Sequence, residues 1–323
     1  MTASPSIGFC FHRTFPAPVV REFAQALDTS DVQELWIIED CFYTGGVSLA
    51  ATALAVSDRL TVGFGILPAV ARAVPITAME LATLAALGPG RLVAGIGHGV
   101  QEWMAQMGVR PESPLTALEE VFAALRRLLA GELVSTDGRY VTLSEVRLDA
   151  PPAVVPPLLA GVQGPKSLEL AGRIADGVVL AEPAGPAYVR WALGQARRDP
   201  AAFEVVTFSQ FCVRSTREEA YAELAPWLAG QLDGQTSGPS GAYRPLPFAA
   251  DLLDWYRRYG TEGLVRMPAD WWSEIGPIGT IEDAAGHIAA LGDAGVARVG
   301  LFPRADLDSA RTQLSHAMEL ARR

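Results

Sequence analysis

The chain has 323 residues, of which 50% are hydrophobic and 19% are charged. This composition supplies enough apolar side chains for a large core and excludes a disordered or fibrous protein. The 26 Lys and Arg residues against 36 Asp and Glu residues leave a net charge of −10, which argues against nucleic acid as a partner and favours a small-molecule substrate.

Short apolar runs alternate with longer amphipathic stretches, as expected for repeated strand and helix units around a parallel sheet. Strands are predicted over residues 7–11, 34–38, 60–67, 92–96, 157–161, 177–181, 205–213 and 297–302. Helices are predicted over residues 17–27, 47–56, 75–87, 114–130, 166–174, 187–197, 216–232 and 306–321. Eight such units indicate an α/β fold in which residues 1–323 form a single TIM (β/α)8 barrel domain with insertions.

Two stretches interrupt the repeat and are predicted to be insertions. Residues 137–156 predict an extra extended excursion. Residues 234–281, rich in Gly, Pro, Ser and aromatic residues, separate the seventh strand from the eighth and contain a predicted helix near residues 248–259. A further helix over residues 281–292 leads into the last strand. The aromatic side chains of the second insertion either form a wall over the cavity or pack a satellite helix.

Residues that directly follow the strands are active-site candidates, because TIM barrels carry their active sites at the C-terminal ends of the strands. These candidates are His12, Arg13, Glu39, Asp40, Cys41, residues 68–72, residues 97–99, residues 162–166, Glu182, Ser215 and Arg304. They predict a polar rim around an apolar cavity.

A glycine-rich segment with glycine at positions 95, 97 and 99 ends the fourth predicted strand. It differs from a Rossmann fingerprint because Val100 stands where the third glycine is needed, and because three strand and helix units precede it. The glycines either let a flat ligand approach the backbone or form a tight turn.

The segment from Gly161 to Ser167 places a strand end, a short turn and a helix start in succession. A helix N-terminus offers unpaired N–H groups and a positive dipole to an anion, and Lys166 and Ser167 add side-chain donors. The segment therefore predicts either a phosphate site or a well-capped helix. The chain lacks the G-x-x-x-x-G-K-[ST] motif of nucleoside triphosphate sites.

Candidate acids and bases lie at the ends of the first, second and fourth strands. His12 and His98 can each act as an acid or base, because the pKa of histidine is about 6.5, or serve as a polar contact. Glu39 and Asp40 are adjacent, so at most one is expected to face the barrel centre. Their charges would raise the pKa of Cys41, which favours a structural or pocket-lining thiol over a nucleophile. The histidine spacing predicts no metal site.

Cysteine usage and the terminal sequence point to the cytoplasm. Cys10, Cys41 and Cys212 are odd in number and lack C-x-x-C spacing, which fits a reducing compartment. Residues 1–18 show no export signal, and no apolar run approaches the roughly 18 residues that would span a bilayer. We therefore expect a cytoplasmic protein with no membrane partner.

Three motifs carry a family resemblance: Gly65-Ile66-Leu67-Pro68 followed by Arg72 and Pro75, the glycine-rich residues 91–99, and residues 164–177, which begin Gly-Pro-Lys-Ser. With them the chain resembles the bacterial luciferase-like superfamily. Within that superfamily it is similar to the deazaflavin-dependent (coenzyme F420) reductases and dehydrogenases. The similarity runs from residue 7 to about residue 180 and returns at residues 295–303.

The resemblance implies a TIM-like barrel that binds a flavin or deazaflavin across the C-terminal ends of its strands. It implies a bulge with a non-prolyl cis peptide behind the cofactor ring, by position at Gly65-Ile66. It also places the glycines of residues 97–99 at the ring edge and residues 161–166 at the phosphate. The cofactor-binding residues so implied are Cys41, Gly65, Ile66, Leu67, Gly97, His98, Gly99, Gly161, Val162, Gln163, Gly164, Pro165 and Lys166.

The chain departs from the family at two positions. The sugar-phosphate dehydrogenases of this group have a histidine after the acidic residue that follows strand two and a glutamate after the strand-four glycines, whereas this chain has Cys41 and Val100. The resemblance therefore favours hydride transfer from reduced F420 to an activated C=C or C=N bond, with Asp40, His12 or His98 as the catalytic proton source.

Two alternatives to an F420-dependent oxidoreductase stay open. The first is a luciferase-like monooxygenase that uses reduced FMN and oxygen. The second is a non-catalytic cofactor-binding barrel, suggested by the missing acid and base. Family members often pair, so a homodimer is also expected.

Overall fold

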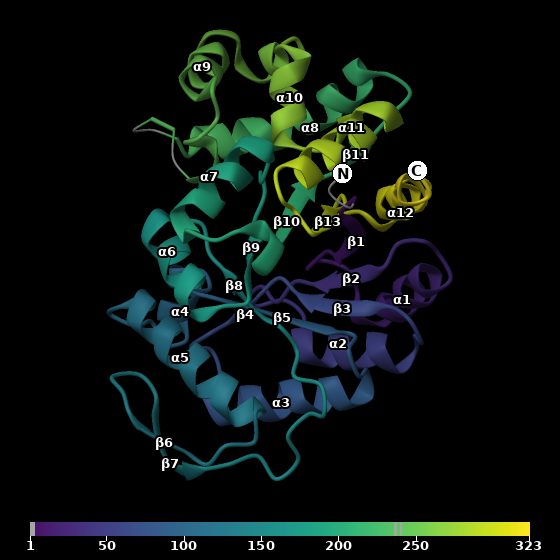
Figure 1. The fold of residues 1–323 in the computed structure, drawn as a ribbon. Coiled ribbons are helices and arrows are strands. Elements are labelled where there is room, and N and C mark those ends of the chain that lie inside the picture. Colours follow the sequence, from purple (N-terminus) through teal and green to yellow (C-terminus); the bar gives the residue numbers. More distant parts are fainter. Residues whose placement is uncertain (1–3, 236–237, 240) are drawn as a thin grey trace.

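The computed structural model describes residues 4–235, 238–239 and 241–323, and within them eight parallel strands close a barrel (Figure 1). Around the barrel the order is β1 (Ser6–Phe11), β2 (Glu34–Ile37), β3 (Thr61–Phe64), β5 (Leu92–Gly97), β8 (Leu158–Gly161), β9 (Gly177–Leu180), β10 (Glu204–Gln210) and β13 (Arg298–Phe302). Pairing of β1 with β13 and of β3 with β5 closes the ring. The predicted TIM barrel is confirmed.

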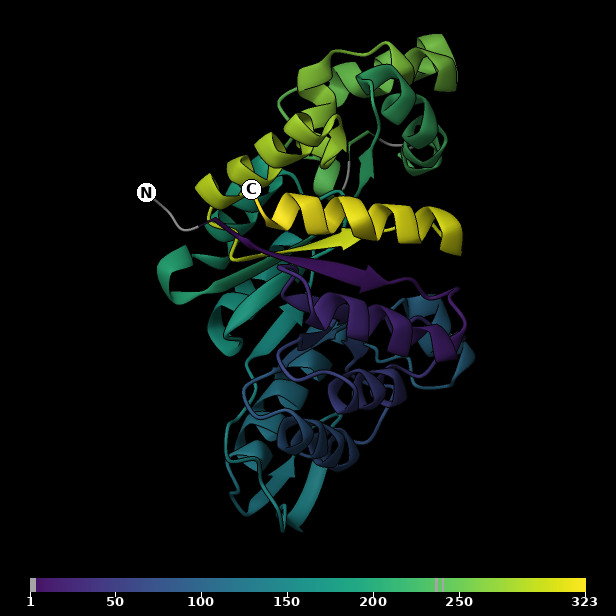
Figure 2. The same cartoon turned by 90° about the vertical axis from the view of Figure 1, so that its right-hand side faces the viewer.

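Helices cover the outside of the barrel, as the alternating pattern predicts. They are α1 (Val20–Asp28), α2 (Gly46–Ala55), α3 (Val74–Leu87), α5 (Pro114–Leu129), α6 (Pro165–Ile174), α7 (Pro186–Ala196), α8 (Arg217–Asp233) and α12 (Leu307–Ala321). Figure 2 shows α12 lying along β1 on the outer surface. Three of these helices begin with proline, whose missing N–H has no partner to lose at a first helical position.

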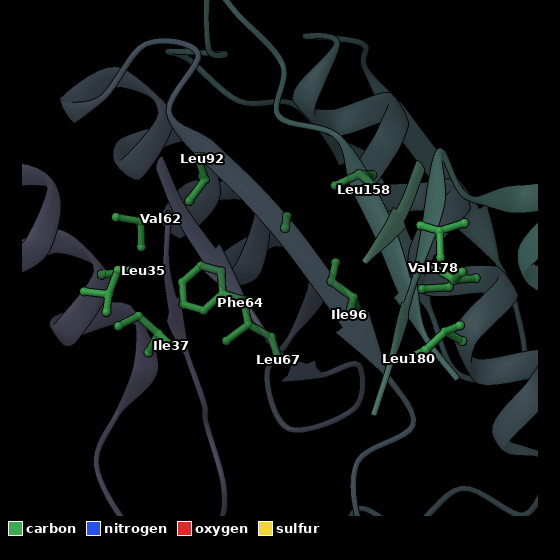
Figure 3. Packing of buried hydrophobic residues seen from close by; sticks show 14 of the residues in the cluster. Leu35, Ile37, Val62, Phe64, Leu67, Leu92, Ile96, Leu158, Val178 and Leu180 are labelled. Carbon is green, nitrogen blue, oxygen red and sulfur yellow. The ribbon is translucent and has the colours of Figure 1, made fainter. Parts of the chain in front are cut away.

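Alternating strand residues build two separate packing layers. Leu35 and Ile37 point outward into the layer between strands and helices (Figure 3), whereas Trp36 between them points into the barrel. The fully buried Glu34 closes the N-terminal end of the barrel. Its carboxylate accepts a hydrogen bond from Trp36 Nε1 at 2.8 Å and pairs with Arg298 Nη1 at 2.6 Å. The barrel interior is therefore filled at that end, which leaves the C-terminal end for a site.

Two predicted strands are shorter in the structure than the apolar pattern indicates. The strand predicted over residues 60–67 breaks after Phe64 and resumes as β4 (Leu67–Pro68). The strand predicted over residues 205–213 leaves the barrel after Gln210, because β11 (Cys212–Val213) pairs instead with β12 (Ile278–Gly279). Both predictions of one continuous strand were wrong, since an apolar run does not reveal a change of pairing partner.

The first insertion is an antiparallel hairpin of β6 (Val134–Asp137) and β7 (Thr142–Val146) that begins before the predicted position 137. The second contains a 3-10 turn (Gly241–Tyr243), α9 (Ala249–Val265) and α10 (Ala269–Ile275), followed by α11 (Ile281–Asp293). Figure 1 shows α9 and α10 at one end of the molecule, beyond α8. Residues 236–237 and 240 of the predicted insertion lie outside the described residues.

The aromatic side chains of the second insertion pack among its own helices and against α8. Trp272 is buried and stacks on Tyr221 of α8, with ring centroids 4.9 Å apart, and Trp271 stacks on Phe248 at the same distance. Of the two readings left open by the sequence, packing of satellite helices is the one observed. In the part of the chain described, no helix is both long enough and apolar enough to cross a membrane.

Candidate functional site

A cavity of about 510 Å³ opens at the C-terminal ends of the barrel strands. Its wall is mainly apolar and includes Ile38, Val179, Phe208 and Phe302. Of the residues predicted to be catalytic or to bind the cofactor, those lining the cavity are Asp40, Gly65, Ile66, His98, Gly99, Gly161, Val162, Gln163 and Gly164. The other members of that set, His12, Cys41, Leu67, Gly97, Pro165 and Lys166, do not line it, whereas the predicted rim residues Glu39, Pro68 and Glu182 do.

The Gly65–Ile66 peptide between β3 and β4 is cis, as the resemblance implies. The side chain of Ile66 lies against Gly161 at the end of β8, where a Cβ atom would stand 2.4 Å from Ile66 Cγ2. A Cβ at Gly97 would stand 2.4 Å from the carbonyl oxygen of Gly161. These two glycines therefore make room for the chain's own bulge and backbone. Leu67 points away from the cavity into the helix layer (Figure 3).

Helix α6 begins at the cavity rim with no side chain capping its N-terminus. Gly164 is the N-cap residue and Pro165 the first helical residue. The side chain of Lys166 is exposed, and Lys166 is the single lysine of the whole chain. Ser167 Oγ lies 3.0 Å from Nε2 of His98, which joins α6 to the end of β5. The sequence predicted either a phosphate site or a well-capped helix for this segment. The prediction of a well-capped helix is wrong in that no side chain accepts a hydrogen bond from the first N–H groups of α6.

The adjacent carboxylates after β2 diverge, each toward its own cation. Both oxygens of Glu39 accept hydrogen bonds from Arg72, at 2.5 and 2.7 Å, and the Gly46 N–H donates to Glu39 Oε2 at 2.7 Å. Asp40 pairs with Arg13 at 2.6 Å. Both carboxylates are thus neutralised by arginine at the cavity edge.

The two histidines at strand ends are held by different neighbours. The ring of His12 packs edge-on against Phe302, 5.5 Å between centroids, and its Nδ1 lies 2.8 Å from the Thr14 hydroxyl. Burial lowers the pKa of His12 and of His98. Both rings are therefore neutral at pH 7, and His12 packs against Phe302, which lines the cavity.

Cys41 stands beside the cavity rather than in its wall. Burial, followed by the charges of Glu39 and Asp40, raises the pKa of its thiol, which agrees with the prediction that it is no thiolate nucleophile. The Cys41–Phe42 peptide is a second non-prolyl cis bond. No motif predicted it.

Glu182 is a cavity residue that the sequence placed at the rim without a role. It follows β9 and lines the cavity opposite the residues after β2. Burial raises the pKa of its carboxyl group. The signal that could have identified it is a lone charged residue after the buried run Val178-Val179-Leu180.

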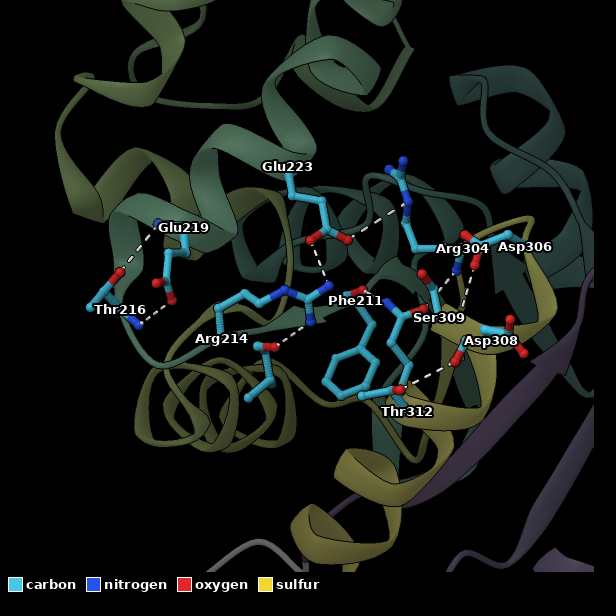
Figure 4. Close-up of polar contacts among 12 residues, drawn as sticks. Phe211, Arg214, Thr216, Glu219, Glu223, Arg304, Asp306, Asp308, Ser309 and Thr312 are labelled. Atoms are coloured by element: carbon cyan, nitrogen blue, oxygen red, sulfur yellow. Dashed lines mark hydrogen bonds and ion pairs between the residues drawn. The ribbon is translucent and has the colours of Figure 1, made fainter.

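Arginines that follow the seventh and eighth barrel strands form ion pairs outside the cavity (Figure 4). Glu223 of α8 pairs with Arg214 at 2.6 Å and with Arg304 at 3.8 Å. Arg304 and Ser215, both predicted rim residues, are thus absent from the cavity wall. Residues 4–235, 238–239 and 241–323 contain no group of three or more His, Cys, Asp or Glu side chains suited to a metal ion.

Comparison with curated proteins finds relatives that match about two thirds of this chain or less. The 5,10-methylenetetrahydromethanopterin reductase of Methanolobus tindarius is 30% identical over 216 residues, which cover 64% of this chain and 65% of the relative. The F420-dependent glucose-6-phosphate dehydrogenase of Beutenbergia cavernae is 32% identical over 44% of this chain and 45% of the relative. The match thus spans less than two thirds of either relative's length.

Solved structures share the fold over nearly the whole chain. The coenzyme F420-dependent tetrahydromethanopterin reductase from Methanopyrus kandleri has a TM-score of 0.78 at 20% identity and covers 98% of this chain and 97% of its own. A type II Baeyer-Villiger monooxygenase from Pseudomonas putida, in complex with FMN, has a TM-score of 0.72 at 14% identity, with 99% and 97% covered. The sequence itself matches the family described as luciferase-like monooxygenase over residues 7–298. The chain therefore belongs to the luciferase-like monooxygenase family.

Proposed function

We propose that this protein is an oxidoreductase that binds coenzyme F420 and transfers a hydride between the deazaflavin and a small organic substrate. The observation that carries the proposal is the uncapped N-terminus of α6 beside an apolar cavity with the Ile66 bulge in its wall. Such a place suits a planar ring with an anionic tail. The two F420-dependent proteins named above support this choice of cofactor.

The residues present fit F420 in both of its parts. Gly65, Ile66, Gly99 and Gly161, with Val162 and Gln163, would hold the ring system, because they leave an apolar surface at the cavity wall. The N–H groups at the start of α6 and the Lys166 ammonium would hold the phosphate-bearing tail. Bound there, the deazaflavin would supply a carbon that gives or takes a hydride. The protein's own task is then to orient the substrate and exclude water.

The class of substrate follows from which acids and bases the cavity contains. Cys41 and Val100 stand where sugar-phosphate dehydrogenases of the family have a histidine and a glutamate. We therefore propose an activated C=C or C=N bond as the hydride acceptor. Asp40, His12 and His98 remain the predicted proton sources, although Asp40 is paired with Arg13 and His98 with Ser167. The homodimer and the cytoplasmic location also remain predictions.

A second candidate is a monooxygenase that binds reduced FMN and activates oxygen. The FMN complex of the structurally similar Pseudomonas putida monooxygenase favours it. The α6 N-terminus would serve the phosphate of FMN as well as that of F420.

Cofactor titration separates the candidates. We would add F420 and FMN separately to the purified full-length protein and record difference spectra. Saturable binding of F420 that is at least tenfold tighter than binding of FMN is the expected result. Tight FMN binding without F420 binding would defeat the proposal, and binding of neither would leave the fold without the proposed cofactor.

The single lysine gives a second readout of the same site. An amine-acylating reagent followed by peptide mapping reports on Lys166 and on the N-terminal amine alone, because the chain has no other lysine. We expect F420 to protect Lys166 from acylation and to leave the N-terminal amine unprotected. Equal labelling of Lys166 with and without saturating F420 would remove the α6 N-terminus from the proposed site.

A further inference from the structure

Glu182 differs from the other carboxylates in the cavity wall because, within the described part of the chain, it forms no ion pair. Glu39 is bound by Arg72 and Asp40 by Arg13. Among the described residues, no arginine or lysine forms an ion pair with Glu182, although it lines the same cavity. An acidic group that stays unpaired in an apolar wall prefers to keep its proton.

The groups that surround Glu182 come from four other elements. Hydrogen bonds from its own backbone N–H and from the side chain of Gln210, at the end of β10, lower the pKa of Glu182. The charge of Asp40, after β2, raises it, and that of Arg13, after β1, lowers it. Burial outweighs these opposing contributions and raises the pKa overall. The fourth element is the second insertion, which contributes Tyr243, and the Cys10 thiol of β1 also senses the charge of Glu182.

Tyr243 adds an independent observation on the same spot. Its side chain is buried, and its hydroxyl oxygen has no hydrogen-bond partner among the described residues. A buried hydroxyl without a hydrogen-bond partner is energetically unfavourable. The Tyr243 hydroxyl lies near enough to Glu182 to sense its charge, although Tyr243 itself does not line the cavity.

We propose that Glu182 is the proton donor of the reduction. This role rests on the proposed F420-dependent function. A hydride from reduced F420 forms a new C–H bond at the carbon of the C=N or C=C group. The π electron pair moves to the nitrogen, or to the atom conjugated with the activating group. The O–H bond of Glu182 breaks and its proton bonds to that atom.

The electrons and atoms balance without another reactant. F420 loses two electrons as a hydride, the substrate gains those electrons with one hydride and one proton, and Glu182 becomes a carboxylate. Solvent returns a proton to Glu182 before the next cycle. In the reverse direction the Glu182 carboxylate accepts the proton, so one residue serves both directions.

The first experiment measures the carboxyl group without any cofactor. Infrared titration of the full-length protein follows the C=O band of protonated carboxylic acids in the wild type, in Glu182→Gln and in Glu262→Gln, which removes an exposed glutamate of α9. We expect one carboxylic acid in the wild type and in Glu262→Gln to keep its proton to a higher pH than the other carboxyl groups do, and this band to be missing in Glu182→Gln. Persistence of that band in Glu182→Gln would overturn the assignment.

The second experiment measures turnover with reduced F420 and two probe acceptors, 2-cyclohexen-1-one and 1-pyrroline. Glu182→Gln is expected to lower kcat by about 10²-fold or more, as loss of a general acid does, and to remove the fall in rate at high pH. Binding of F420 stays unchanged, and Glu182→Asp recovers part of the rate. Unchanged kcat and an unchanged pH profile in Glu182→Gln would overturn the proposal. If the wild type does not bind F420, the proposed function itself is refuted.

Discussion

Replacing Gly161 with alanine tests how the bulge is packed against the end of β8. The new methyl group would stand 2.4 Å from Ile66 Cγ2, and its three nearest atoms all belong to Ile66. Overpacking of this kind costs about 1–3 kcal/mol. The unfolding entropy of a chain this long is about 0.7 kcal/mol per degree, so a loss of 2 kcal/mol lowers Tm by about 3 °C.

The double variant shows whether Ile66 is the cause. Ile66→Ala alone should cost about 1–2 kcal/mol, because the side chain is only partly buried. Gly161→Ala combined with Ile66→Ala should be more stable than the sum of the two losses by about 1–2 kcal/mol, since the clash is gone. Gly194→Ala, at an open helical position of α7, should gain about 0.5–1 kcal/mol. Urea unfolding measures all four proteins, and losses that simply add would refute this account of the bulge.

Three further predictions concern pH, an ion pair and the cofactor tail. The Nδ1 of the buried His287 donates to the Ser273 carbonyl, and burial lowers the pKa of this histidine from 6.5 to about 4. Because the unfolded chain binds the proton more readily than the folded chain, about 3 kcal/mol of stability is lost as the pH falls from 6.5 to 4. Urea unfolding against pH should show this slope in the wild type and a flatter one in His287→Asn. Glu39→Gln should cost about 2 kcal/mol in urea unfolding because Arg72 loses a bidentate partner, and a loss below about 0.5 kcal/mol would contradict that. Lys166→Met should weaken F420 binding about fivefold, or about 1 kcal/mol, without affecting a deazaflavin that lacks the phosphate; equal weakening of both would contradict a tail contact.

The repeat of strands and helices could be read from the sequence because each unit obeys a local rule. Outward strand residues such as Leu35 and Ile37 are apolar for the helix layer, and the period of the pattern changes where each helix begins. Residues 60–67 mislead because the cis peptide at Gly65 leaves the run of apolar residues unbroken. The family resemblance located that bulge, whereas periodicity could not.

The site was predicted in outline but not in its pairings. Strand ends point to the cavity, so position alone identified Asp40, His98 and Gly164 as neighbours of one site. Which cation binds which carboxylate depends on contacts 27 residues apart, as between Arg13 and Asp40, and no local pattern encodes those contacts. For the same reason the sequence could not show that Glu182, unlike Glu39 and Asp40, forms no ion pair among the described residues.

The distribution of positive charge around the rim decides how a cofactor with an anionic tail would lie. TIM barrels commonly bind phosphate after their seventh and eighth strands, but here Arg214 and Arg304 at those positions are both engaged by Glu223. The start of α6, after the fifth strand, keeps its N–H groups uncapped and carries the single lysine. Under the proposed function an anionic tail would therefore be drawn to α6, which would direct the ring toward Ile66 and leave the side with Glu182 for the substrate.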